Sequence, residues 1–362
     1  MSKTLKTMTI AATEAPVFYN EDAISQLNNY LENSDHSMVF ILVDSNTHEY
    51  CLSSFLARLN NKGKFEIIEV EDGEINKNLE TCSGVWNALS ELGADRKSLL
   101  INLGGGVVTD LGGFVASTFK RGIRYINVPT TLLSMVDASV GGKTGVDLGN
   151  LKNQIGVINQ PEMVLIISSF LKTLPKDEMR SGLAEILKHG LISSEEYWNK
   201  ANALSELTLE DLDDLIEESV EIKKEVVTQD PFEKNIRKTL NYGHTLGHAI
   251  ESYCLTSKSR EKLLHGEAVA IGMILATYIS KELEGFPENK LQDITHKILD
   301  IFGKESFTQH DIDEIIQLMK YDKKNEKGKI NFVLLQDIGK PVIDRQVPNK
   351  IIFNAFEFYA GS

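Results

Sequence analysis

The first half of the chain alternates short apolar runs with longer amphipathic segments. A helical pattern over Lys77–Leu92 separates two of the apolar runs. Strands separated by helix-length segments predict βαβ units and a mainly parallel sheet. The runs of strand length are Met38–Asp44, Phe65–Val70, Ser98–Leu103, Arg124–Val128 and Met163–Ile167.

The pattern changes after Pro175, where long acidic amphipathic segments follow one another with few strands between them. These segments predict helices over Lys176–Leu191, Leu207–Thr228, Gly266–Leu283 and Gln309–Lys320. We therefore expect an α/β nucleotide-binding domain with a mainly parallel sheet over residues 1–175. A mostly α-helical, metal-binding domain should follow over residues 176–362, with the boundary near Leu174–Lys176.

Composition narrows the class of protein. A chain of 362 residues with 42% hydrophobic and 25% charged residues has the make-up of a globular protein of two domains. Its formal net charge of −14 argues against a nucleic-acid partner. No apolar run approaches the roughly 18 residues that span a bilayer, and Met1–Ala12 lacks the apolar core of a signal peptide. Together with three scattered cysteines, this predicts a cytoplasmic protein without a membrane partner.

Candidate chemistry concentrates in the segment NYGHTLGHAIE at 241–251, followed by LHGE at 264–267. His244 and His248 are four residues apart, so both lie on one face of a helix. His265 follows shortly after them, and each of the three histidines neighbours a glycine in the sequence. The arrangement indicates a metal or proton-transfer site.

A carboxylate could complete a site with two histidines and one carboxylate, a ligand set that suits Zn²⁺. Glu185 is one candidate, because it shares a predicted helix face with Lys188 and His189. The residues alone leave the third ligand open among Glu185, His189, His248 and Glu267.

Two glycine-rich segments are candidates for binding anions. LGGGVVTD at 103–110 joins a strand to a helix, where backbone amides can hold a pyrophosphate, although a tight turn with Asp110 at the helix start fits equally well. The second segment, residues 137–156, carries Lys143 and Lys152 in a predicted loop. It is no P-loop, because Asp137 stands where the first glycine of that motif belongs; the alternative is a flexible, solvated loop. The cations of 221–224 and 233–238 are interpreted mostly as solvated helix faces.

Taken together, the motifs resemble those of the 3-dehydroquinate synthase family. The matching segments cover most of the chain in order: DGE at 72–74, GGGVVTD at 104–110, FKRG at 119–122, VPTTLL at 128–133, GGKTGVD at 141–147, LKNQIG at 151–156, AEILKHG at 184–190, NYGHTLGHAIE at 241–251, LHGEAVAIGM at 264–273 and DKK at 322–324. The resemblance implies an NAD-binding α/β domain and a helical domain that carries the metal, with the active site between them.

The activity implied is conversion of a small anionic sugar phosphate, 3-deoxy-arabino-heptulosonate 7-phosphate, into 3-dehydroquinate and phosphate. The implied steps are transient oxidation by NAD, elimination of phosphate, reduction, ring opening and aldol closure. The implied metal is Zn²⁺, with Co²⁺ as the alternative.

The resemblance also implies a role for each matching residue. The metal ligands would be Glu185, His244 and His265, and the catalytic and supporting residues would be His248, Lys188, Asp137, Asn153 and Glu233. Substrate would be bound by Arg121, Lys143, Lys152, Lys223, Arg237, Asn241 and either Lys323 or Lys324. Arg121 would come from the neighbouring subunit, which implies a homodimer.

Cofactor contacts are implied in six places along the first domain. The residues are Asp72, Gly73, Glu74, Ile75, Asn76, Lys77, Gly106, Val107, Val108, Thr109, Asp110, Thr130, Thr131, Lys143, Lys152, Phe170, Leu171, Lys172 and Thr173. Two features depart from the family pattern. Thr109 replaces a common glycine, and we expect its hydroxyl to bond the pyrophosphate. The segment Ser252–Leu264 is longer than usual, and we expect an exposed loop there.

Three other functions remain to be weighed. A related cyclase acting on a different phosphorylated sugar would not need the carboxylate-binding set Lys152, Lys223 and Arg237. A metal-dependent polyol dehydrogenase of the same superfamily would accumulate NADH. A non-catalytic nucleotide- or metal-binding regulator would not need His248 and Lys188 beside the ligands.

Overall fold

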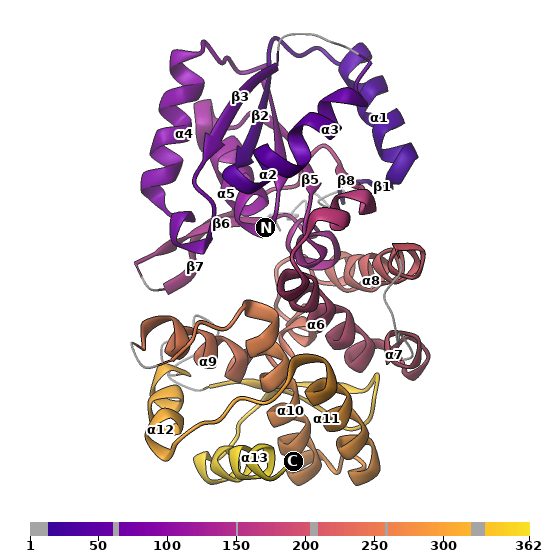
Figure 1. Cartoon of the computed structure of the whole chain (residues 1–362), viewed down its shortest axis with the longest axis vertical. Helices are drawn as coiled ribbons and strands as arrows, with labels where there is room; N and C mark the ends of the chain where they lie inside the picture. Colours follow the sequence, from indigo (N-terminus) through magenta and orange to yellow (C-terminus); the bar gives the residue numbers. More distant parts are fainter. Residues whose placement is uncertain (1–13, 61–64, 150, 203–208, 258–259, 320–329) are drawn as a thin grey trace, which may run out of the picture.

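The computed structural model describes residues 14–60, 65–149, 151–202, 209–257, 260–319 and 330–362 (Figure 1). Lys323 and Lys324 lie outside these ranges. No helix within them is long and apolar enough to cross a membrane.

A six-stranded sheet organises the first half of the chain, in the order β1-β8-β5-β4-β2-β3, and every described strand pair in it is parallel. This confirms the predicted fold class and all five predicted strands. The strands are β1 (Val17–Tyr19), β2 (Val39–Asp44), β3 (Phe65–Val70), β4 (Leu99–Gly104), β5 (Arg124–Pro129) and β8 (Val164–Ile166).

Both faces of the sheet are covered because alternate side chains of a strand point to opposite sides. In β2, Ile41 packs in the same core as Leu27 of α1, whereas Leu42 packs with Leu89 of α4 and Val115 of α5. All six residues of β2 are buried, which explains its continuous apolar run. The helices in this half are α1 (Asn20–Asn33), α2 (Ser45–Thr47), α3 (Ser53–Ala57), α4 (Leu79–Glu91) and α5 (Gly106–Thr118).

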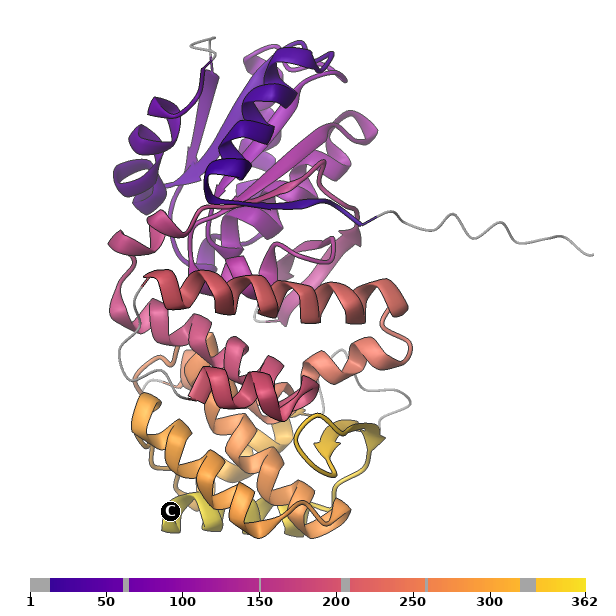
Figure 2. The ribbon, with the colours of Figure 1, turned by 90° about the vertical axis from the view of Figure 1, so that its right-hand side faces the viewer.

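The second half is mostly helical, as predicted, and α10 lies at its centre, packed against α6, α9, α11 and α13. Helices α6 and α8 lie between the sheet and the remaining helices in both views (Figures 1 and 2). The helices are α6 (Lys176–Ser193), α7 (Glu195–Asn202), α8 (Leu209–Gln229), α9 (His244–Thr256), α10 (His265–Glu284), α11 (Glu288–Phe302), α12 (Gln309–Leu318) and α13 (Asn349–Gly361), with a hairpin of β9 (Phe332–Leu335) and β10 (Pro341–Arg345).

The lysine-rich segment differs from its prediction. In place of a loop, its second part forms an antiparallel hairpin of β6 (Lys143–Leu148) and β7 (Leu151–Ile158). Close packing of backbones explains the glycines, since a Cβ on Gly145 would lie 2.6 Å from the carbonyl oxygen of Ile155. The hairpin packs on α5 and carries both lysines of the motif.

The segment Ser252–Leu264 is only partly the exposed loop that we expected. Helix α9 continues to Thr256, and the chain leaves it at Ser257. Arg260 then anchors the connection, because its guanidinium pairs with Asp311 at the start of α12 and lies over the Phe307 ring, 5.6 Å from the centroid.

Glycines set the distance between α9 and α10, the two helices that begin with His244 and His265. A Cβ on Gly272 would lie 2.1 Å from the carbonyl oxygen of Gly243. A Cβ on Gly266 would lie 2.1 Å from that of Ser181, so α10 touches α6 equally closely. The three helices can approach this closely only without side chains at these positions.

We predict that Gly272→Ala lowers the free energy of unfolding by about 1–3 kcal/mol, because the added methyl overpacks a rigid backbone contact. The matched control is Gly84→Ala in α4, where a Cβ would meet nothing within 4 Å. That variant should gain about 0.4–1 kcal/mol. Urea unfolding of both variants measures the difference, and equal stabilities would contradict the close approach.

Candidate active site

Three histidines converge where α9 and α10 begin. Gly243 adopts a left-handed conformation (φ 77°) just before α9, so the chain turns sharply and His244 becomes the first helical residue. His248 lies one turn later, and His265 is the first residue of α10. The ring centroids are 5.1 Å apart for His244 and His248, 5.5 Å for His244 and His265, and 5.6 Å for His248 and His265.

Glu185 of α6 extends its carboxylate toward the first turns of both helices. Its Oε1 lies 3.4 Å from Nε2 of His244 and 3.6 Å from Nε2 of His265. Two atoms bound tetrahedrally to one zinc ion stand about 3.4 Å apart. Glu185 has no exposed surface, and its Oε1 has no hydrogen-bond partner among the described residues. A buried carboxylate oxygen without a partner is costly unless a cation satisfies it, so the residues fit a metal ion.

The second ring nitrogen of each of the two proposed histidine ligands has a hydrogen-bond partner. Nδ1 of His244 lies 3.1 Å from the carbonyl oxygen of Tyr242, and Nδ1 of His265 lies 3.3 Å from Oε2 of Glu251. With each Nδ1 at a hydrogen-bond acceptor, Nε2 is the ring nitrogen that faces Oε1 of Glu185, and a bound metal ion would displace any proton on it. Burial alone would lower the pKa of His265, but the charges of Glu251 and Glu185 raise it to about 9.

The structure distinguishes some of the other candidates for the third ligand. Glu267 accepts a hydrogen bond from the backbone amide of Leu264 (2.9 Å), so it caps its own helix. His248 stays within reach, since ligand atoms of the three histidines all lie within 4.8 Å of one another. Glu185 also forms a second such group with Asp137 and His189. The geometry therefore brings together all the predicted ligands and leaves His248 beside them.

His189 lies on the same helix, α6, and is fully buried. Its Nδ1 lies 2.5 Å from the Ser219 hydroxyl, and its Nε2 lies 3.9 Å from Oδ1 of Asp137. Burial lowers the pKa of His189 to about 3, so the ring is neutral at pH 7.

A buried charge cluster adjoins Glu185. Lys188 is 1% exposed; its Nζ pairs with Glu185 and lies 3.9 Å from Oδ1 of Asp137. Lys223 of α8 donates to the same Oδ1 at 2.7 Å. Burial alone would raise the pKa of Asp137, but Lys223 and Lys188 hold it well below its usual range. The predicted catalytic pair Lys188 and Asp137 is thus assembled next to the candidate metal ligands.

Two cations from segments that we interpreted mostly as solvated helix faces are buried, and they are the two to which the resemblance assigned substrate binding. Lys223 is 6% exposed and Arg237 is 2% exposed. Arg237 donates to the carbonyl oxygens of Pro231 (2.7 Å) and Gly141 (3.1 Å), and its Nε has no partner among the described residues. The amphipathic pattern around Lys223 indicated a solvated helix face. In the structure, helix α8 packs against the Ser134–Ala138 segment.

The predicted phosphate-binding residues also meet. Lys143 of the hairpin forms an ion pair with Glu233, and the Asn241 amide donates to the other oxygen of Glu233 at 2.7 Å. Two segments far apart in sequence, the hairpin and the region 233–241, therefore contribute to one polar cluster. Arg121 is exposed in the turn after α5, and no described hydrogen bond or ion pair joins it to this cluster.

On the cofactor side, Lys77 joins three segments. Its buried Nζ donates to Asp110 of α5 (2.6 Å) and to Asn153 of the hairpin (2.7 Å). The Asp72–Lys77 turn therefore adjoins the N-terminus of α5, where backbone amides are available to a pyrophosphate. Thr131 borders the same loop, since a Cβ on Gly105 would lie 3.0 Å from its Cγ2.

Other predicted cofactor residues point into the protein. Thr109 is 1% exposed and its hydroxyl donates to the carbonyl oxygen of Gly105 (3.2 Å), so the expected bond from this hydroxyl to a pyrophosphate is wrong for this structure. Val108, Phe170 and Leu171 are buried in the cores. Any contact of these three with a cofactor would have to use backbone atoms.

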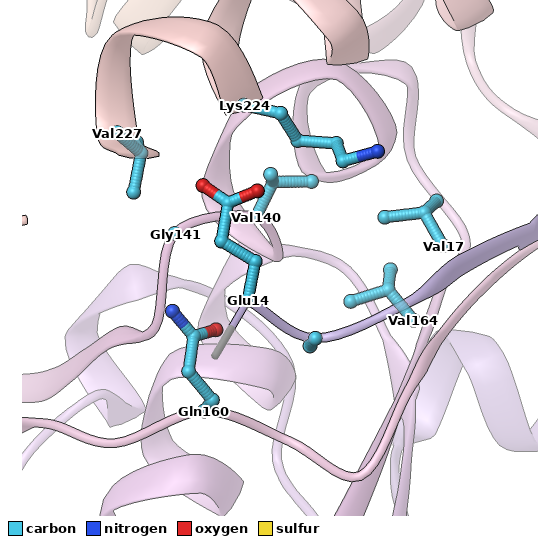
Figure 3. A pocket seen from close by; sticks show the side chains of 9 residues that line it. Glu14, Val17, Val140, Gly141, Gln160, Val164, Lys224 and Val227 are labelled. Carbon is cyan, nitrogen blue, oxygen red and sulfur yellow. The ribbon is translucent and has the colours of Figure 1, made fainter. Parts of the chain in front are cut away.

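The small cavity in Figure 3 is a separate feature. It lies beside Gly141 and is lined by Glu14, Gln160 and Lys224 among others. Its volume of about 10 Å³ suits a single water molecule. It is too small for a sugar phosphate.

Comparison with known proteins gives the family. The model described as 3-dehydroquinate synthase N-terminal matches residues 67–181, and the one described as 3-dehydroquinate synthase C-terminal matches residues 182–325. A 3-dehydroquinate synthase from Parabacteroides distasonis is 42% identical over 352 residues, which are 97% of this chain and 99% of that relative. The chain belongs to the 3-dehydroquinate synthase family.

A second 3-dehydroquinate synthase, from Pyrococcus furiosus, is 41% identical and aligns over 92% of this chain and 96% of its own. Among solved structures, 2-epi-5-epi-valiolone synthase from Streptomyces hygroscopicus subsp. jinggangensis, with NAD⁺ and Zn²⁺ bound, has a TM-score of 0.84 at 25% identity, covering 96% and 97% of the two chains. A 2-deoxy-scyllo-inosose synthase complexed with carbaglucose-6-phosphate, NAD⁺ and Co²⁺ has a TM-score of 0.81 at 24% identity, covering 95% and 98%. The latter likeness shows the fold alone.

Within this member of the 3-dehydroquinate synthase family, sequence reasoning missed the contribution of Glu251. The residue closes the NYGHTLGHAIE motif, and its carboxylate contacts both His265 and Lys152. Its spacing was the available signal, because position 251 follows His248 by one helical turn and so faces the same side.

We predict that His248→Ala binds metal in the parent's stoichiometry while its turnover falls by about 10²–10⁴-fold, as for removal of an acid–base group. His265→Ala should lose the metal. Metal analysis after dialysis, alongside steady-state rates, distinguishes the two. Loss of the metal from His248→Ala would show that three histidines, rather than two and Glu185, are the ligands.

Proposed function

We propose that the chain converts 3-deoxy-arabino-heptulosonate 7-phosphate into 3-dehydroquinate and phosphate, using NAD and a divalent metal held by Glu185, His244 and His265. Family membership supports the activity. The observation that carries the site is the unpartnered Oε1 of buried Glu185, which lies within 3.6 Å of two imidazole nitrogens. No other described feature explains why that oxygen is buried there.

The cofactor assignment rests on two kinds of support. The related cyclases were solved with NAD⁺ and with Zn²⁺ or Co²⁺, and this chain offers a glycine-rich loop at Gly104–Gly106 before α5, with the Lys77–Asp110 pair beside it. When bound, NAD supplies a reversible hydride acceptor, and the metal lowers the pKa of the substrate hydroxyls that it holds.

The chain's own residues bind, orient and move protons around those groups. Lys188 and Asp137 lie beside the metal ligands and can hold the reacting hydroxyls by charge-assisted hydrogen bonds. His248, one helical turn from His244, is placed to transfer a proton. Lys143 and Asn241 share Glu233 and can exchange it for the phosphate of the substrate.

The substrate carboxylate separates this activity from that of related cyclases. Lys223 and Arg237 adjoin the same Asp137–Gly141 segment, so they form a compact cationic site on one side. Lys152 lies elsewhere, between Glu74 and Glu251. We therefore propose that Lys223 and Arg237 bind the carboxylate, and that Lys152, the third residue of the implied set, serves as the hairpin's contact near the cofactor segment.

We propose the domains as residues 1–175 and 176–362, a homodimer as the assembly, and the cytoplasm as the location. The cysteines Cys51, Cys82 and Cys254 are all free and buried, which suits a reducing compartment. Arg121 is exposed and lies apart from the phosphate-binding cluster of its own chain. It is therefore accessible to the active site of a neighbouring subunit.

Incubation with the seven-carbon keto-acid phosphate, NAD and Zn²⁺ should release phosphate and dehydroquinate in equal amounts, with no lasting NADH absorbance. Chelation should abolish turnover, and Zn²⁺ or Co²⁺ should restore it, because Glu185 Oε1 and the two imidazoles need a cation between them. NADH accumulation would indicate a dehydrogenase, and full activity without metal would contradict the metal assignment.

The dimer proposal predicts complementation between two inactive variants. Mixing Arg121→Ala with His248→Ala through unfolding and refolding should restore about a quarter of parental activity, because half of the dimers are hybrid and each has one complete site. Each variant refolded alone is the control. No recovery, with hybrid dimers verified by mass, would show that Arg121 does not act across the interface.

A further inference from the structure

Glu251 occupies a position between two parts of the proposed site. Its side chain is 7% exposed, and each of its oxygens has its own partner. Oε2 lies 3.3 Å from Nδ1 of the proposed ligand His265, and Oε1 accepts from Nζ of Lys152 at 2.5 Å.

The contacts continue on the far side of Lys152. Its Nζ lies 3.5 Å from Oε1 of Glu74, which lies 3.9 Å from Nζ of Lys77, which in turn donates to Asp110. Alternating charges thus run from a proposed metal ligand on α10 to the helix that follows the glycine-rich loop. Glu251 is the step at which this series passes from the helical half to the β6–β7 hairpin.

Two ion pairs among the described residues tie the hairpin to the helical half. One is the ion pair of Lys143 with Glu233, and the other is that of Lys152 with Glu251. Otherwise its main packing is on α4 and α5 of the first half. The Glu251 contact therefore joins the side that would hold the cofactor to the side that would hold the metal.

We propose that Glu251 is a positioning residue through which metal loading orders the β6–β7 hairpin. This inference rests on the metal site of the proposed function. A carboxylate that accepts from Nδ1 keeps the imidazole oriented with Nε2 toward the metal. With His265 fixed by the metal, Glu251 is fixed too, and its second oxygen then holds Lys152 and the hairpin in place.

The test uses the full-length protein with and without Zn²⁺ and has two readouts besides activity. Metal affinity is measured by competition with a chelator. Order in the hairpin is measured by hydrogen exchange of peptides covering residues 143–158. In the parent, Zn²⁺ should slow exchange in those peptides.

Glu251→Ala should weaken Zn²⁺ binding by about 10–100-fold, as loss of such a supporting carboxylate usually does. At saturating Zn²⁺ it should also show no metal-dependent slowing in the hairpin. Glu251→Gln keeps the side-chain volume and an acceptor for Nδ1 but loses the charge opposite Lys152. This variant therefore distinguishes loss of the ionic contact from a failure to fold. Lys152→Met should keep metal affinity within about 3-fold, since Lys152 contacts none of the three proposed ligands and Glu251 keeps its contact with His265, yet lose the slowing.

Glu284→Gln, at the far end of α10 where Glu284 pairs with Arg345, is the matched control and should behave as the parent. Unchanged metal affinity in Glu251→Ala, or hairpin exchange in the parent that ignores Zn²⁺, would overturn the inference while leaving the metal site intact. Unchanged affinity in both Glu185→Ala and His244→Ala would instead overturn the metal site, and the inference with it.

Discussion

The candidate site depends on a carboxylate with no exposed surface. Glu185 lies inside α6, where burying an ionised group costs several kcal/mol unless charges and hydrogen bonds compensate it. Lys188 pairs with one oxygen, and two imidazole nitrogens face the other at 3.4 and 3.6 Å. Much of the surrounding structure serves this arrangement. Gly266 and Gly272 let α10 approach α6 and α9 closely enough to bring both histidines to that oxygen.

The same principle of compensated charge extends away from Glu185. Asp137, Lys188 and Lys223 balance one another in a buried cluster, and Lys77 balances Asp110 on the cofactor side. Charges buried in pairs cannot move independently, because removing one partner leaves the other uncompensated. Ionic contacts of Asp137 and of the β6–β7 hairpin thus add to the apolar core that the two halves of the chain share, and an anionic substrate would have to exchange partners with these charges.

The sequence predicted the layers of the fold well because strands that are buried in a sheet consist mostly of apolar residues. The five predicted strands are mostly apolar segments of strand length, and β2 and β4 are buried at every residue. The β6–β7 hairpin was missed because six of the eight residues of β7 are exposed, so no alternation of polar and apolar residues marks it. The Lys223 and Arg237 side chains were misjudged because their burial comes from segments distant in sequence, which local periodicity does not register.

At the site, residue types and spacing predicted which side chains gather, while the partners of each atom came only from the structure. The i, i+4 spacing placed His248 beside His244, but the unpartnered Oε1 of Glu185 and the Glu251 contact to His265 depend on how three helices pack. The central claim is that Glu185 and two histidines hold the metal. X-ray absorption at the zinc edge of the loaded, substrate-free protein tests it most directly. The spectrum should show two imidazoles and oxygen ligands; three imidazoles would contradict the claim.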